Sequence, residues 1–214
     1  MINQFLASQL RQPSGWFGKQ IISRILNRDN ASMNNLALRM LKLKSKANRR
    51  HPRGIRVLEL GFGGGYLLNK LLKNPEVEFV AGVDVSPEMV DFCRQRFSSE
   101  IKAGKLKLNY GNTVNPANFN HSFTKICTVN TIYFWSDVKQ TLSQLYQILE
   151  VEGSLVICFN SKDFLKKTAL PKYGFQLYET EEVKKMMKAV GFKNINWIVN
   201  SEPKQQFVCI VGEK

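Results

Sequence analysis

The feature that most constrains the fold is a glycine-rich turn between an apolar strand and a helix. The stretch "VLELGFGGGYLL" covers residues 57–68 and holds four glycines within five positions. The residues before the glycines have the continuous apolar character of a buried strand, and those after them have the spacing of a helix. Such a turn directs backbone N–H groups and the positive end of a helix dipole toward a ligand. The stretch therefore predicts a ligand site in an α/β fold.

Strand-like and helix-like segments alternate beyond this turn. Alternation of this kind indicates a doubly wound α/β domain, in which helices cover both faces of a parallel sheet. The connection "NSEPK" is too short for a crossover helix, so the last two strands are predicted to form an antiparallel hairpin. The expected strands are 55–60, 77–84, 105–110, 124–130, 154–159, 193–199 and 205–212, and the expected helices are 64–73, 87–98, 137–149 and 179–190.

The N-terminal quarter of the chain differs from the rest in charge. Residues 1–54 carry eleven Lys or Arg and a single acid, Asp29, which gives a net charge of +10, whereas residues 55–214 carry only +4. Apolar residues recur at helical spacing in the basic segment. We therefore divide the chain into a basic helical N-terminal extension, 1–54, and an α/β domain, 55–214. The extension is expected to act as a lid over the carboxyl edge of the sheet.

Composition restricts the class of protein. No apolar run reaches the roughly 18 residues that span a bilayer, and the N-terminus lacks the features of a secretory signal. We therefore expect a cytoplasmic protein. Its cysteines are far apart and lack the spacing of a metal site, so we expect reduced core thiols and no metal. These cysteines are Cys93, Cys127, Cys158 and Cys209.

Two carboxylates accompany the glycines. The glycines follow the spacing G-x-G-x-G, and Tyr66 stands where the dinucleotide form G-x-G-x-x-G needs a glycine, which argues against NAD. Glu59 precedes the turn, and Asp84 ends the next strand, where a carboxylate can accept hydrogen bonds from both hydroxyls of a ribose. The pattern therefore predicts a nucleoside site that needs no pyrophosphate.

Several motifs resemble those of the class I S-adenosylmethionine-dependent methyltransferases. "VLELGFGGG" is similar to their first motif, "GVDVSPEMV" to the motif with the ribose acid, "GNT" at 111–113 to the adenine-contact position, and "ILEVEGSLVICF" to the approach to the fifth strand. The N-terminal segment resembles an extension found in one bacterial subgroup. Asn112 departs from the acid usual in the family, and Val151-Glu152 from the usual Pro-Gly. The resemblance implies a Rossmann-like seven-stranded sheet and S-adenosylmethionine as cofactor.

The resemblance also implies which residues bind that cofactor. Glu59 would face its ammonium group, Asp84 would hold its ribose, and Asn130 would face the reactive methyl. Val85 would pack on the adenine. The residues implied around the methionine portion are Gly61, Phe62, Gly63 and Gly65, and those at the adenine edge are Asn112 and Thr113.

The stretch "CTVNTIYFWSD", 127–137, is expected at the carboxyl edge of the sheet, where open α/β sheets bind ligands. It resembles the N-x-x-Y-F-W stretch of methyltransferases that act on small molecules or lipids. Its three aromatic residues would either wall an acceptor pocket or pack in the core. Tyr133 is the candidate for orienting or deprotonating an acceptor. Residues 130–133 also echo the Asn-Pro-Pro-Tyr signature of amino-group methyltransferases, but without its prolines.

We therefore predict a methyltransferase for a small molecule or a lipid head group. Two alternatives are a nucleic-acid methyltransferase, which we favour less, and a non-catalytic S-adenosylmethionine-binding module. The charges of the N-terminal extension would be solvated on the lid, or would hold the protein at an anionic membrane surface, or would contact a phosphate backbone. Trp16 and Phe17 suit the membrane alternative, in which the protein is peripheral to the bilayer.

Overall fold

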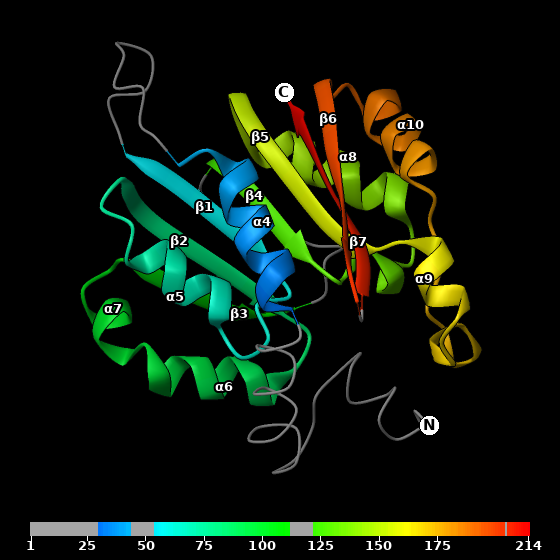
Figure 1. The fold of residues 1–214 in the computed structure, drawn as a ribbon. Helices are drawn as coiled ribbons and strands as arrows, with labels where there is room; N and C mark the ends of the chain where they lie inside the picture. The colour runs from blue at the N-terminus through cyan, green and yellow to red at the C-terminus, as the bar shows by residue number, and fades with distance from the viewer. Residues whose placement is uncertain (1–29, 44–53, 112–121, 204) are drawn as a thin grey trace.

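A seven-stranded sheet forms the centre of the structure, a computed structural model that describes residues 30–43, 54–111, 122–203 and 205–214 (Figure 1). The strand order is β3-β2-β1-β4-β5-β7-β6. The strands are β1 Ile55–Leu60, β2 Val77–Asp84, β3 Leu106–Tyr110, β4 Phe123–Val129, β5 Leu149–Asn160, β6 Lys193–Glu202 and β7 Gln205–Glu213. All seven lie at the predicted places, although β5 and β6 are longer than predicted.

The pairing directions match the sequence prediction. β1 pairs parallel with β2 and β4, and β5 is parallel to β4. β7 runs antiparallel to both β5 and β6, which confirms the C-terminal hairpin. The chain reverses its direction of winding between β1 and β4, which are neighbours in the sheet. Ligands of open α/β sheets bind outside the carboxyl ends of the strands at such a switch point.

Helices cover both faces of the sheet (Figure 1). The predicted helix 87–98 is divided in two, and two short helices between β5 and residue 174 were not predicted. One face carries α4 Ala31–Leu41, α5 Tyr66–Leu72, α6 Pro87–Arg96 and α7 Ser98–Lys102. The other face carries η3 Ile132–Phe134, α8 Val138–Ile148, α9 Lys162–Lys166, η4 Leu170–Tyr173 and α10 Thr180–Val190. Within the described ranges, no helix is long and apolar enough to cross a membrane.

Helix α4 belongs to the core of the α/β domain. It packs across β4, β5 and β7 and beside α5, and Met33, Ala37 and Leu41 have no exposed surface. The prediction that the whole N-terminal extension covers the carboxyl edge as a lid is therefore wrong for residues 31–41, which cover a face of the sheet. Residues 1–29 and 44–53 of that extension lie outside the described residues.

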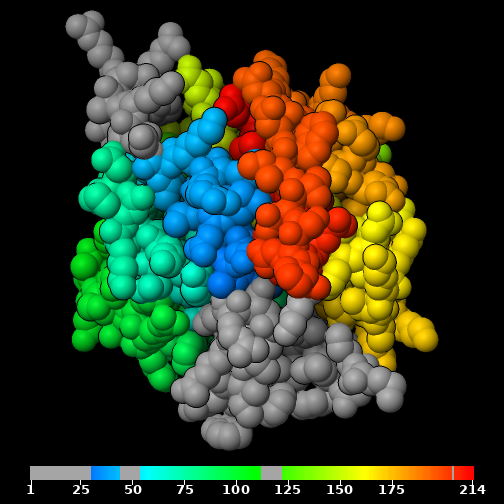
Figure 2. Space-filling model, viewed as in Figure 1, coloured from blue at the N-terminus to red at the C-terminus, as the bar shows by residue number. Residues whose placement is uncertain are grey.

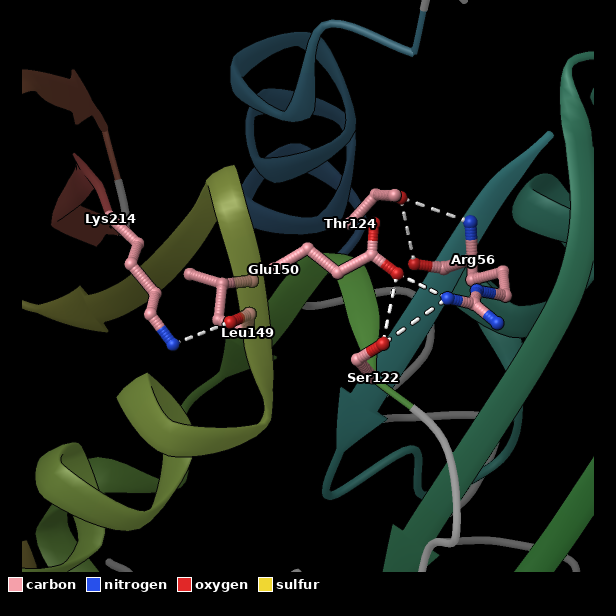
Figure 3. A network of polar contacts seen from close by, with 6 residues as sticks. All are labelled: Arg56, Ser122, Thr124, Leu149, Glu150 and Lys214. Carbon is pink, nitrogen blue, oxygen red and sulfur yellow. Dashed lines mark hydrogen bonds and ion pairs between the residues drawn. The ribbon is translucent and has the colours of Figure 1, made fainter. Parts of the chain in front are cut away.

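A polar clamp joins three strands at the amino edge of the sheet (Figure 3). The guanidinium of Arg56 on β1 donates to Glu150 on β5 and to Ser122, 3.2 Å away and directly before β4. Thr124 accepts from the Arg56 backbone N–H and donates to its carbonyl oxygen, both at 3.0 Å. Lys214 donates to the Leu149 carbonyl oxygen at 2.7 Å. The clamp lies opposite the carboxyl edge and leaves that edge to a ligand.

A disulfide crosses β5 and β7. Cys158 and Cys209 lie directly opposite each other in the antiparallel register, with their Cα atoms 4.1 Å apart. The prediction of reduced thiols is therefore wrong for this pair, because a separation of 51 residues along the chain gave no sign that the register would join them. Cys93 and Cys127 are free and buried, as predicted.

Candidate active site

The glycine turn lies between β1 and α5 and adopts a left-handed backbone at three glycines. The φ angles of Gly61, Gly63 and Gly65 are +70°, +46° and +73°. A Cβ on Gly61 would lie 2.3 Å from Thr131, and one on Gly65 would lie 2.7 Å from the ring of Phe97. A Cβ on Gly63 would have no atom of the described residues within 4 Å. Packing thus requires the outer two glycines, whereas the space beside Gly63 is open to a ligand.

We expect Gly63→Val to lower the affinity for S-adenosylhomocysteine by about 100-fold in a protein that still folds. The isopropyl group would enter the open space, and the left-handed backbone would cost about 1–2 kcal/mol. Isothermal titration calorimetry measures the affinity. Gly104→Val is a matched control, since Gly104 has φ +72° and an equally open Cβ position at the other edge of the sheet. Equal cofactor affinities in the two variants would show that Gly63 serves only the turn.

Asp84 ties the glycine turn to the end of β2. Its Oδ2 accepts from the Gly63 N–H at 2.8 Å, and its Oδ1 accepts from the Ser86 N–H at 2.9 Å. Burial raises the pKa of the carboxyl to about 6, against the opposing effect of these backbone hydrogen bonds. Asp84 is therefore mostly ionised at neutral pH and lies beside the open space at Gly63, as a ribose acceptor should.

Glu59 is buried near the end of β1, two residues before Gly61. Its side chain is 4% exposed, and its Oε2 has no hydrogen-bond partner among the described residues. Burial raises the pKa of Glu59 to about 8, and the charge of Asp84 raises it further. Unpaired buried carboxyl oxygens are costly, and a cationic group of a ligand would satisfy this one.

The other residues implied for the cofactor fall into two groups. Phe62 is 3% exposed and its ring packs against Gly82 of β2. Its side chain is therefore part of the core. Val85 is half-buried directly after β2. Asn112 and Thr113 lie outside the described residues, and so does the contact predicted between them and the adenine.

A network of uncharged side chains lies at the carboxyl ends of β4 and β5. Asn130, which has φ +59°, accepts at its Oδ1 from the Tyr133 hydroxyl at 2.9 Å and from Asn160 Nδ2 at 3.1 Å. Its Nδ2 donates to Asn30 Oδ1 at 2.8 Å. Gln205 Nε2 donates to Asn160 Oδ1, also at 2.8 Å. Four segments far apart in sequence thus converge next to the switch point.

Tyr133 supports this network from the core. Its side chain is 2% exposed, its ring packs on Phe175, and its hydroxyl accepts from the Asn160 N–H as well as donating to Asn130. Burial raises the pKa of Tyr133 well above its ordinary value, so the hydroxyl keeps its proton. Trp135 is 1% exposed and donates to Thr131. Tyr133 and Trp135 therefore pack in the core and do not wall an open acceptor pocket.

Sequence reasoning missed three members of the network. Asn160 ends the stretch "ICFN" at the carboxyl end of a strand, so the argument applied to Asn130 could have found it. Gln205 and Asn30 gave no local signal, because only the hairpin and the packing of α4 bring them to this edge. Among the described residues, no group of three or more His, Cys, Asp or Glu side chains could hold a metal ion.

A comparison with protein families assigns the central part of the chain. Residues 58–155, which contain the glycine turn, Asp84 and Asn130, match the family model described as "Methyltransferase domain". The matched residues form a methyltransferase domain. The strand order and the antiparallel hairpin belong to the same domain and extend beyond the matched residues.

Relatives of this methyltransferase domain span most of the chain. The "Uncharacterized methyltransferase YdaC" of Bacillus subtilis (strain 168) is 25% identical over 91% of this chain and 98% of its own length. The "Malonyl-[acyl-carrier protein] O-methyltransferase" of Acetivibrio thermocellus is 27% identical over 58% of this chain and 40% of its own length. The structure of Haemonchus contortus phosphoethanolamine N-methyltransferase 2 with S-adenosyl-L-methionine matches 99% of this chain and 57% of its own, at 14% identity and a TM-score of 0.67.

Proposed function

We propose that this domain transfers a methyl group from S-adenosylmethionine to a small molecule or a lipid head group. The observation that carries the proposal is the buried Glu59, whose unpaired Oε2 lies next to the glycine turn. S-adenosylmethionine has an ammonium group to meet this carboxyl and a ribose to meet Asp84. Since the space beside Gly63 is open, the chemistry of the residues fits the cofactor.

When bound, the cofactor supplies a methyl group already activated by the positive sulfonium. The protein therefore has to bind, orient and desolvate, and no nucleophilic side chain is needed. In the proposed complex Glu59 holds the ammonium, Asp84 accepts from the ribose hydroxyls, and the main chain at Gly63 passes close to the ligand. Asn130, fixed by Tyr133 and Asn160, would face the acceptor in this complex.

The chemistry of the polar network supports a particular kind of acceptor. Its side chains are amides and one phenol, and the phenol keeps its proton because burial raises the pKa of Tyr133. Such groups donate and accept hydrogen bonds but do not remove a proton from an acceptor. We infer an acceptor that arrives already nucleophilic, such as a neutral amine or a carboxylate. The names of an O-methyltransferase for a malonyl group and of a phosphoethanolamine N-methyltransferase are compatible with this class.

Calorimetry with S-adenosylhomocysteine tests the cofactor assignment. We expect binding in the micromolar range, and Asp84→Ala should weaken it by about 10- to 100-fold, because a charge-assisted hydrogen bond contributes about 1.5–3 kcal/mol. Asp91→Ala is a matched control, since Asp91 is an exposed acid on α6. Unchanged affinity in Asp84→Ala would contradict the ribose assignment, and tighter binding of NAD than of S-adenosylhomocysteine would contradict the cofactor.

The acceptor class can be tested by incubating the protein with methyl-labelled S-adenosylmethionine and separated cell fractions. Label in the small-molecule or lipid fraction supports the proposal. Label in RNA or DNA would favour the nucleic-acid alternative, for which residues 130–133 lack both prolines of the signature. Cofactor binding without label in any fraction would favour the non-catalytic module.

The positive charge of residues 1–54 bears on where in the cell the protein acts. We propose that the protein acts in the cytoplasm and that these basic residues attract it to an anionic bilayer, at about 1 kcal/mol for each Lys or Arg near the surface. Side-by-side binding to vesicles containing phosphatidylserine and to an oligonucleotide would distinguish a membrane surface from a nucleic acid. Preference for the oligonucleotide would contradict the membrane proposal.

A further inference from the structure

The polar network at the carboxyl ends of β4 and β5 continues onto α4 and β7. The Sδ of Met33 on α4 accepts from Asn130 Nδ2 at 3.3 Å and from Gln205 Nε2 at 3.1 Å. In Figure 2, α4 (blue) lies directly beside the C-terminal hairpin (orange to red), and α4 contacts β7. Met33 has no exposed surface, so two amides from distant parts of the chain share one buried sulfur atom.

A single backbone N–H fixes the orientation of the amides in this network. The Asn160 N–H donates to the Tyr133 hydroxyl, which leaves Asn130 to take the hydroxyl proton. The Asn130 atom that accepts it must be the oxygen, and the Asn160 atom that shares this oxygen must be Nδ2. Asn160 then turns its Oδ1 toward Gln205, which must donate from Nε2. The remaining atom of the Gln205 amide is therefore its oxygen.

The sulfur of Met33 gives the same orientation independently. A thioether sulfur has no proton and can only accept, so the amide groups that face it must be NH2 groups. Asn130 and Gln205 both present their nitrogens to it. Two unrelated contacts thus agree on the polarity of the network.

The capacity for further hydrogen bonds is concentrated at Gln205. Asn130 is saturated, since its Oδ1 accepts two hydrogen bonds and its Nδ2 donates to Asn30 and to Met33. Gln205 Nε2 is likewise occupied by Asn160 and Met33. Gln205 Oε1 has no donor among the described residues and is not buried. The network therefore offers a carbonyl oxygen with both lone pairs open.

We propose that Gln205 determines the acceptor specificity of the domain by accepting a hydrogen bond from an amine. The inference rests on the proposed function and selects between its two acceptor chemistries. An amine nitrogen donates an N–H to Gln205 Oε1 and keeps its lone pair for the methyl group, whereas a carboxylate has only acceptor oxygens, which the Gln205 oxygen would repel. A carboxylate would need donors, and the NH2 group of Asn30 lies at the other end of the chain of amides.

The chemical bond that holds the transferred methyl group tests this choice. The protein is incubated with methyl-labelled S-adenosylmethionine and the cell fraction that takes up label. Alkali releases a methyl ester as volatile methanol, whereas a methylated amine keeps its label and binds to a cation exchanger after acid hydrolysis. We expect the label on an amine. Label released as methanol, or left on a product that the exchanger does not retain, would overturn the role of Gln205 and leave the methyltransferase proposal intact. No label in any fraction would overturn both.

Gln205→Leu tests the residue itself. Loss of one hydrogen bond to the acceptor should raise the apparent KM, measured by diluting the labelled fraction, by about 10-fold. The affinity for S-adenosylhomocysteine should stay unchanged. Gln206→Leu is the matched control, because Gln206 lies on the other face of β7, where it contacts Ser161 and Ser201. Circular dichroism checks that both variants fold.

Met33→Leu separates the Gln205 oxygen from its support. Leu has about the volume of Met, so the core is kept, but the NH2 groups that faced the sulfur lose a partner. We expect a smaller rise in KM, about 3-fold, because Gln205 Oε1 is still present but is held less firmly. Equal KM values for Gln205→Leu and Gln206→Leu would refute the proposal. A larger effect of Met33→Leu than of Gln205→Leu would also refute it, because the effect would then come from the packing of α4.

Discussion

Glu59→Gln is expected to lower the affinity for S-adenosylhomocysteine by roughly 150- to 5000-fold at pH 8. Removing one partner of a buried ion pair costs about 3–5 kcal/mol, and the amide would leave the ammonium group of the ligand without its counter-charge. Calorimetry measures the loss. Gln has nearly the volume of Glu, so the variant should keep the packing between β1, β2 and β4.

The same substitution is expected to stabilise the free protein at high pH. Burial raises the pKa of Glu59 from 4.5 to about 8, so the folded state binds the proton more tightly than the unfolded state does. The stability that this provides is complete below pH 4.5 and is lost as the pH rises through about 8. At pH 8, Glu59→Gln should therefore raise the free energy of unfolding by about 2–4 kcal/mol, and at pH 4.5 by little.

Proton release gives a second measurement on the unaltered protein. Because Glu59 is largely protonated near pH 7, binding of the cofactor's ammonium group should displace the proton, and affinity should increase as the pH rises from 6 to 8. Calorimetry in buffers of different ionisation enthalpy counts the protons. Affinity independent of pH, together with unchanged binding by Glu59→Gln, would remove Glu59 from the site.

Deletion of residues 1–46 is expected to unfold the domain or to leave it barely stable. The deletion removes Met33, Leu36, Ala37 and Leu41, which are at most 3% exposed. Losing one large buried side chain costs about 2–5 kcal/mol, and a typical domain has only about 5–15 kcal/mol in total. Loss of the cooperative thermal transition in circular dichroism would verify this.

Deletion of residues 1–28 is the matched control, since it retains Asn30 and all of α4. We expect this shorter deletion to keep the thermal transition. It therefore tests the predicted lid directly: reduced cofactor affinity and turnover support a lid, whereas loss of vesicle binding alone supports an anchor. A protein lacking residues 1–46 that melted near the temperature of the full chain would show that α4 is dispensable.

Much of the fold followed from local sequence patterns. The glycine turn, the strand that ends at Asp84 and the short connection between β6 and β7 each have a local physical cause, and the structure has all three. The place of α4 was harder to predict. Its apolar stripe showed that it must cover something, but a stripe does not indicate which surface it covers.

Local sequence patterns also predicted only part of the candidate site. Glu59 and Asp84 could be named as candidates because each has a fixed place relative to the turn in a parallel sheet. Gln205 reaches Asn160 only because β7 returns antiparallel beside β5. The disulfide between Cys158 and Cys209 has the same origin. Contacts set by the register between distant strands have no local signature, so sequence patterns missed them.

The hydrogen bond between Asn30 and Asn130 ties the amino end of α4 to the carboxyl end of β4. Lys214, by contrast, contacts the Leu149 carbonyl at the opposite edge of the sheet. A substitution at the amino end of α4 would therefore act beside the polar network, whereas a tag fused after Lys214 would be attached at the opposite edge of the sheet.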